Sequence, residues 1–419
     1  MSNPLQPAFR RLFDAKSHWH KANAAYFEPN EFRISINSCI QELRNVTFVL
    51  QANKREIPDF DEWYAPWQEK MRANQSLKWL VEARNYIVKR GDLELLSKLR
   101  IEVIGSYLDG EIAIFEEEYN PNLTNTEVYE KTVALGLPAE VFESSYVKLQ
   151  RRWIDKNYPE YELAELLSQC WSAVSELLLD APNIEGSSRN TGTKTKLPPC
   201  MHQELEMRVA WMKVHGKTLV PAEIHSEVIS SEDIDRTELT EKYGDSPIFK
   251  NQEEVKNPAE QSFKEQVVLL FEHAKFLLKK DGYHVHIVMI YVDQKLAKII
   301  ELRNEDQADK FVTIRNLASQ MEQIGADSFI MISEAWSAVY DPAHHYRRAA
   351  DAPNRQEVLM AIAATQADES YCFTAPFFRE NNEISFGRTT VSDATEINTI
   401  QPILSMWKKQ KPAHPGSKS

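Results

Sequence analysis

The chain has 419 residues, which is too long for one ordinary hydrophobic core, so two or three domains are expected. Hydrophobic residues make up 42% and charged residues 26%, as in globular proteins and unlike disordered or membrane-spanning chains. The formal net charge of −13 argues against a protein that coats nucleic acid through a broad basic surface, but a small basic cleft remains compatible with it.

The same features predict a cytoplasmic chain with no membrane association. No apolar run is long enough to span a bilayer, and the first residues lack the apolar core of a signal peptide. The four cysteines show no CxxC spacing, which is typical of reduced, mostly buried thiols: Cys39, Cys170, Cys200 and Cys372.

The first 180 residues are expected to form an all-α bundle. Six of the nine tryptophans but only four of the twelve glycines lie in this region, and its apolar residues recur with helical spacing. Helices are predicted over residues 31–54, around 63–67, and over 77–90, 93–108, 128–134, 139–153 and 162–179.

Two of these helices set up the candidate site. In the helix over 31–54 one apolar stripe is evident, formed by Phe32, Ile36, Cys39, Ile40, Leu43, Thr47 and Leu50. In the helix over 77–90, Arg84 falls on the predicted core stripe formed by Leu77, Leu80, Val81, Ile87 and Val88. An inward guanidinium costs several kcal/mol unless it is paired or faces a wet cleft, so Arg84 needs an explanation.

Residues 181–257 are predicted to link the bundle to a second domain. Residues 181–199 are rich in Pro, Gly, Ser and Thr, as linkers are. The alternation of Met207, Val209 and Trp211 before His215-Gly216 indicates a short hairpin. Residues 226–257 are acidic and are expected to be loop-like.

Residues 258–419 are predicted to form an α+β domain with a mixed or antiparallel sheet. The expected helices span 260–280 and 306–324, and the expected strands span 284–292, 296–302, 328–333, 358–364, 371–378 and 384–388. The tail after Met406, which is rich in lysine, is expected to be disordered.

The segment Glu82-Ala-Arg84-Asn85-Tyr-Ile-Val-Lys89-Arg-Gly91 is similar to the signature of the HEPN superfamily. That family is a small, commonly dimeric helical bundle with nucleotide-binding and ribonuclease-like members. Its motif is an Arg, usually followed by Asn, His or Asp, and a His four to six residues later. The resemblance covers about residues 10–120, and Lys89 stands where the family has histidine.

The resemblance implies that Arg84, Asn85 and Lys89 contact the phosphate of RNA or a nucleotide, with Arg44 of the preceding helix as a companion. Lysine is a poor general base near neutrality, so ribonuclease activity is left open. His18 and His20 beside Trp19 could supply an imidazole or simply lie at the surface. The alternative for Arg84 is an ordinary ion pair with a buried carboxylate.

A second cluster follows the strand over 328–333. Glu334, with Arg347, Arg348 and Arg355, could bind an anionic ligand in a cleft, or Glu334 could pair with an arginine at a solvated loop. His284 and His286 would share a strand face, but no third metal ligand is evident. No zinc-finger, Walker or Rossmann motif is present, so no metal or cofactor is expected.

The sequence therefore predicts a homodimeric protein that binds RNA or a nucleotide through a HEPN-like bundle, as in toxin–antitoxin and phage-defence systems, with a possible protein partner for the C-terminal domain. One rival is a non-enzymatic interaction or scaffold protein. The other is an enzyme whose site lies near Glu334.

Overall fold

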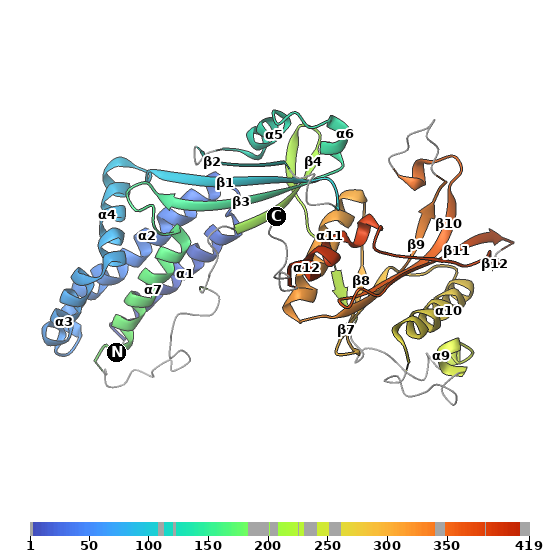
Figure 1. Cartoon of the computed structure of the whole chain (residues 1–419). Helices are drawn as coiled ribbons and strands as arrows, with labels where there is room; N and C mark the ends of the chain where they lie inside the picture. Colours follow the sequence, from blue (N-terminus) through green and yellow to red (C-terminus); the bar gives the residue numbers. More distant parts are fainter. Residues whose placement is uncertain are drawn as a thin grey trace, which may run out of the picture. The chain divides into compact units, whose positions relative to one another are not determined.

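The chain forms two units in the computed structural model (Figure 1). Unit 1 comprises residues 1–103, 113–143 and 147–222, and unit 2 comprises residues 104–112, 144–146 and 223–419. The structure describes residues 3–107, 123–182, 201, 208–224, 226–229, 241–250, 261–339, 348–381 and 383–410, together with the backbone of 113–119.

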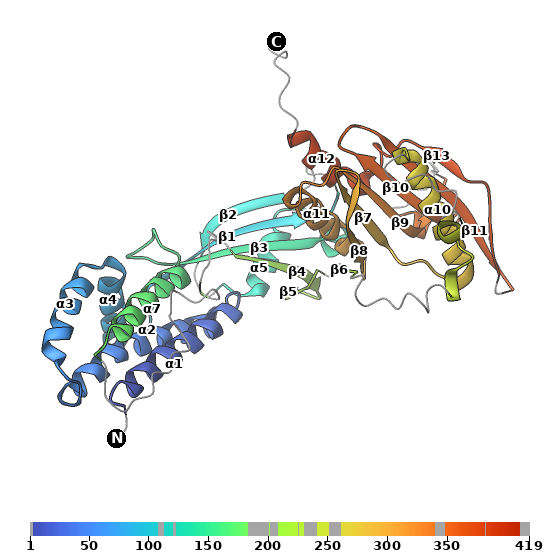
Figure 2. The same cartoon turned by 90° about the horizontal axis from the view of Figure 1, so that it is seen from below.

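Unit 1 contains a helical bundle. Its helices are α1 (Gln6–Ala24), α2 (Pro29–Ala52), α3 (Phe60–Ala73), α4 (Gln75–Arg90) and α7 (Leu163–Leu179). Figure 2 shows α1, α2 and α7 side by side. The first and last helices are joined by buried bonds from Trp19 Nε1 to the Ala164 carbonyl (2.8 Å) and from Trp171 Nε1 to the Leu12 carbonyl (3.0 Å). All seven residues of the stripe predicted for α2 are buried.

A five-stranded sheet completes unit 1. Its strand order is β2 (Ala113–Tyr119), β1 (Leu95–Ile104), β3 (Tyr146–Asp155), β4 (Arg208–His215) and β5 (Thr218–Pro221). Two short helices, α5 (Asn125–Val133) and α6 (Ala139–Glu143), share a hydrophobic core with this sheet. The predicted hairpin is confirmed, because β4 and β5 pair as antiparallel neighbours.

Two predicted helices of this region are wrong. Residues 93–108 supply β1, where Leu95, Ser97, Leu99, Ile101 and Val103 are buried at every second position. Residues 139–153 form only the short helix α6 before β3 begins. The first 180 residues are therefore not all-α, although the helical bundle itself is present. Helix α1 was not among the predicted helices.

Unit 2 is built on one antiparallel sheet. Its strands run in the order β12 (Glu383–Phe386), β11 (Ser370–Glu380), β10 (Gln356–Thr365), β9 (Ser328–Ser337), β7 (Ile287–Val292), β8 (Lys295–Leu302) and β6 (Ser226–Val228), and β13 (Thr390–Ser392) also pairs with β11. All described pairings are antiparallel. The multidomain fold class, with an N-terminal helical bundle and a C-terminal α+β domain, is confirmed.

Helices cover both faces of this sheet (Figure 1). One core joins Val288 and Ile290 to α11 (Gln307–Gln323) and α12 (Gln401–Gln410), while the other joins Met289 to α10 (Phe263–Asp281). Helices α10 and α11 begin at capping boxes made by Ser262 with Glu265 and by Asp306 with Asp309. They end before Gly282 (φ 81°) and Gly325 (φ 68°), where positive φ suits glycine.

Two further expectations about unit 2 need correction. Residues 226–257 are not simply loop, because β6 pairs with β8 and the short helix α9 spans Pro247–Lys250. Residues 407–410 are not disordered, because they belong to α12, where Trp407 is buried and donates to the Ala326 carbonyl (2.9 Å). Residues 183–200 and 411–419 lie outside the described residues.

Two expectations about environment meet direct observations. Among the described residues no helix is both long and apolar enough to cross a membrane. Cys39, Cys170 and Cys372 are free and buried, and Cys200 lies outside the described residues.

Candidate functional site

Helix α4 carries the predicted site residues. Asn74 caps its start by accepting from the Leu77 amide (3.0 Å), and Gly91 ends it with φ 105°. The buried face of α4 consists of Leu77, Trp79, Leu80, Ala83 and Ile87. The expectation that Arg84 lies on the core stripe is therefore wrong. The buried face includes Trp79 and Ala83 in place of the predicted Val81 and Val88, and Arg84 is half-buried at its edge.

The three residues of the HEPN-like motif differ in their surroundings. The half-buried Arg84 donates from Nη1 to Asn85 Oδ1 over 3.4 Å, a long contact. Asn85 and Lys89 are exposed. The motif thus presents polar groups at the surface of α4 and does not enclose them.

Arg44 of α2 lies close to Arg84. The Cζ atoms of Arg44 and Arg84 lie 4.8 and 5.4 Å from the centre of the Phe48 ring, so both guanidinium groups share one aromatic side chain. Burial lowers the pKa of Arg44, the neighbouring Tyr64 opposes this change, and the positive charge of Arg84 adds to it. The sequence predicted that Arg44 and Arg84 lie near each other, and in the structure both side chains contact Phe48.

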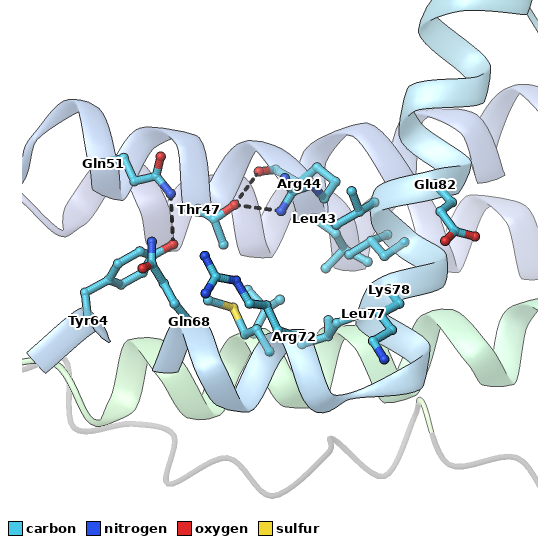
Figure 3. Close-up of a pocket in the computed structure, with 14 residues that line it drawn as sticks. Leu43, Arg44, Thr47, Gln51, Tyr64, Gln68, Arg72, Leu77, Lys78 and Glu82 are labelled. Carbon is cyan, nitrogen blue, oxygen red and sulfur yellow. Dashed lines mark hydrogen bonds between the residues drawn. The ribbon is translucent and has the colours of Figure 1, made fainter. Parts of the chain in front are cut away.

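Arg44 also lines a cavity of about 470 Å³ between α2, α3 and α4, to which α7 contributes Val174 (Figure 3). Its other polar lining residues are Thr47, Gln51, Tyr64, Gln68, Arg72, Lys78 and Glu82. Inside it, Arg44 Nη1 donates to Thr47 Oγ1 (3.0 Å) and Gln51 Nε2 donates to the Tyr64 hydroxyl (3.2 Å). Arg84 is not part of this lining.

The positive charge of Arg44 and Arg84 is not neutralised within the described part of the chain. Neither arginine forms an ion pair there, and the buried Nε of Arg44 has no hydrogen-bond partner. Nearby arginines differ, since Arg11 pairs with Glu42 (3.0 Å) and Arg33 with Asp92 (2.6 Å). The alternative that Arg84 pairs with a buried carboxylate thus finds no support among these residues.

Sequence reasoning missed Phe48, Gln68, Arg72 and Lys78. A signal was available for Phe48, because it follows Arg44 by four residues and therefore shares its helix face. The other three come from α3 and α4, and their approach to Arg44 depends on how the three helices pack, which no local pattern encodes.

The second predicted cluster is not an open anion site in the described residues. Glu334 accepts from Arg379 Nη2 (2.8 Å) and from the His284 amide (2.5 Å). Arg348 forms two bonds with Asp351 (2.7 and 2.8 Å). Arg355 packs over Trp336, with 4.9 Å between its Cζ and the ring centre, and donates to the Ala350 carbonyl. Arg347 lies outside the described residues.

The predicted histidine pair does not share a strand face. Strand β7 begins at Ile287, so His284 and His286 both precede it. His284 Nδ1 lies 2.7 Å from the Val285 carbonyl. Among the residues that the structure describes, no group of three or more His, Cys, Asp or Glu side chains is arranged to hold a metal ion.

Comparison with known proteins gives one family over nearly the whole chain. The family model described as "Bacteriophage lambda protein ea47" matches residues 2–417. The chain belongs to this family. A curated relative, "Protein ea47" of Escherichia phage lambda, is 28% identical over 397 residues, which are 90% of each protein. No solved structure gives a significant match.

Proposed function

We propose that the helical bundle binds phosphate groups of RNA or of a nucleotide at the basic cleft between α2, α3 and α4. The observation that supports this is the unneutralised charge of Arg44, a half-buried guanidinium whose Nε lacks a partner among the described residues and which shares the Phe48 ring with a second arginine, Arg84. Such a group is costly until an anion binds it. Arginine suits phosphate because its planar fork forms two parallel hydrogen bonds.

The proposal stops at binding and does not extend to RNA cleavage. Asn85 and Lys89 are exposed on α4, and the motif over residues 82–91 contains no histidine, the commonest general base in catalysis. Arg84, which shares the Phe48 ring with Arg44, and the exposed Lys89 therefore act only as phosphate contacts. Ribonuclease activity would need a general base that neither residue supplies.

The test is a binding titration of labelled single-stranded RNA and of a labelled nucleotide, at low and at physiological salt. Arg44→Gln is expected to weaken binding about tenfold or more, because a hydrogen bond to a charged group contributes about 1.5–3 kcal/mol. Arg84→Gln is expected to weaken it less, because Arg84 lies outside the cavity lining. Binding should also weaken as salt rises.

Arg55→Gln is the matched control, because it removes the same charge from an exposed residue outside the cavity. Its affinity should stay within twofold of wild type. The same RNA is examined for cleavage products, and we expect none. Failure of the wild type to bind either ligand at low salt, or equal affinities of wild type and Arg44→Gln, would refute the proposal.

A further inference from the structure

The α2–α3–α4 cavity differs from a surface that follows a nucleic-acid chain. Its volume of about 470 Å³ lies within the range of small-molecule sites, roughly 300–1,000 Å³. A protein that tracks a nucleic-acid backbone needs a basic groove extending over several nucleotides. Here the cations converge on one hollow instead.

The lining is divided into an apolar part and a charged part. Leu43, Met71, Leu77, Leu80 and Val174 supply an apolar wall, which suits the face of a nucleobase. Gln68 also lines the cavity, and its amide has no hydrogen-bond partner in the described part of the chain. An amide carries both donors and an acceptor, as the edge of a base does.

The charge of the lining matches a doubly charged phosphate. Arg44, Arg72 and Lys78 contribute three positive charges and Glu82 one negative charge, which leaves a net charge of +2 (3 − 1). Arg72 also pairs with Glu69 (2.5 Å), but both side chains are more than 70% exposed, so a ligand can replace that pair at little cost. A phosphomonoester carries about −1.5 to −2 at pH 7, whereas an internal phosphodiester of RNA carries one negative charge.

The three cations also come from three helices. Figure 3 shows Arg44 reaching in from α2 and Arg72 from α3, with Lys78 on α4 beside Leu77. All three side chains line the same cavity, so a phosphate bound there lies near cations from more than one helix. An internal phosphate, flanked by nucleotides on both sides, needs more room in a cavity of this volume than a terminal one.

We propose that this cavity binds a nucleotide that ends in a phosphomonoester, with the base against the apolar wall and Gln68 and the phosphate at Arg44, Arg72 and Lys78. This inference rests on the proposed function and sharpens it. The nucleotide can be a free mononucleotide or the phosphorylated end of an RNA chain, because both carry the same terminal group.

The experiment is calorimetric titration of the full-length protein with the four nucleoside 5′-monophosphates, the nucleosides, inorganic phosphate and a dinucleotide that has one internal phosphate and hydroxyl ends. At least one monophosphate is expected to bind tenfold or more tightly than its nucleoside and than the dinucleotide. RNA oligomers with a 5′-phosphate and with a 5′-hydroxyl, titrated in parallel, distinguish a chain end from a free nucleotide by their affinities relative to the monophosphate.

Variants then test the two parts of the cavity. Lys78→Gln should weaken monophosphate binding about tenfold, and Gln68→Leu should weaken it several-fold while leaving inorganic phosphate unchanged. Arg55→Gln should change neither, and circular dichroism of each variant checks that it folds. The inference would be overturned if monophosphate and nucleoside bound equally. It would also be overturned if neither Lys78→Gln nor Gln68→Leu, both folded, changed the affinity.

The inference and the proposed function can fail separately. If RNA binds through Arg44 but neither monophosphates nor 5′-phosphorylated ends are preferred, the inference is wrong and the proposed function stands. If neither RNA nor any nucleotide binds, both are wrong.

Discussion

The guanidinium carbon of Arg44 lies 4.8 Å from the centre of the Phe48 ring, one helical turn further along α2. The Arg84 guanidinium approaches the same ring from α4, at 5.4 Å. The ring face is attractive to cations, so Phe48 partly offsets the repulsion between the two arginines. It also holds the Arg44 side chain beside the cavity before any ligand binds, which reduces the side-chain conformational entropy that is lost on binding.

Phe48→Leu is therefore expected to weaken phosphate binding without unfolding the protein. Loss of a cation–π contact at a partly exposed site corresponds to about 0.5–1 kcal/mol, or roughly a two- to fivefold loss of affinity. Because Phe48 is 40% exposed, the free energy of unfolding should change little. Phe13→Leu, at an exposed position of α1, is the control, and an equal affinity loss in both variants would contradict the role given to Phe48.

Trp79→Phe should destabilise unit 1 by about 1–3 kcal/mol, because it removes a donor from a buried carboxylate. Trp79 Nε1 donates to Asp155 Oδ2 over 2.9 Å, and both residues are buried. Trp67→Phe is the matched comparison, since its indole bonds to Asp180 (2.6 Å) in an exposed setting. Trp67→Phe should lower the free energy of unfolding, measured in urea, by less than about 1 kcal/mol. Equal costs would show that burial does not decide the contribution of this bond.

Much of the fold could be predicted wherever the apolar residues followed either the helical or the strand period clearly. Helices α2, α10 and α11 show clear apolar stripes, α10 and α11 also begin at capping boxes, and the β4–β5 hairpin has a glycine turn at Gly216. In these elements the local preference and the burial in the fold agree.

The errors arose where the two periodicities compete. In β1 the run Leu93 to Leu108 satisfies helical spacing as well as alternation, and its β-branched Ile101 and Val103 were the signal for a strand. In β3 the alternating buried positions include Arg151, which is 0% exposed, so an arginine interrupts the apolar series. The site was predictable as far as Arg44 and Arg84, but the cavity depends on the packing of α2, α3, α4 and α7.

Trp407→Ala should destabilise unit 2 by about 3–5 kcal/mol, as the loss of a large buried aromatic side chain does. Trp407 is 3% exposed and lies in the core shared with α11 and the sheet. Lys408→Ala, at the next and exposed position, should leave thermal unfolding almost unchanged. Similar melting of the two variants would mean that α12 does not pack as described.

The stability of unit 2 should fall as the pH is lowered from about 6.5 towards 4. Burial, followed by the positive charges of Lys310 and His284, lowers the pKa of His286 from 6.5 to about 4. The unfolded chain therefore binds more protons than the folded chain in this window, and the free energy of unfolding decreases as the pH is lowered. Urea unfolding of His286→Leu should show a shallower slope than the wild type. His20→Leu, at an exposed position of unit 1, is the control.

Arg379→Gln separates the second predicted cluster from the proposed site. Arg379 bridges Glu334 (2.8 Å) and Glu357 (3.3 Å), and these side chains are 25–39% exposed. The variant should lower the free energy of unfolding, measured in urea, by about 1 kcal/mol or less, because exposure to solvent weakens ion pairs. Its affinity for RNA should equal that of the wild type. A loss of RNA binding in this variant would assign a ligand to the C-terminal sheet.

The bonds between α1 and α7 also bear on how the chain folds during its synthesis. Trp171 and Leu12 are 159 residues apart, and Trp19 and Ala164 are 145 apart. At 5–20 residues per second, a ribosome needs roughly 7–30 s to make α7 after α1. During that delay α1 can pack on α2, but the part of α1 that contacts α7 has no partner, so a chaperone has a defined interval in which to bind that part.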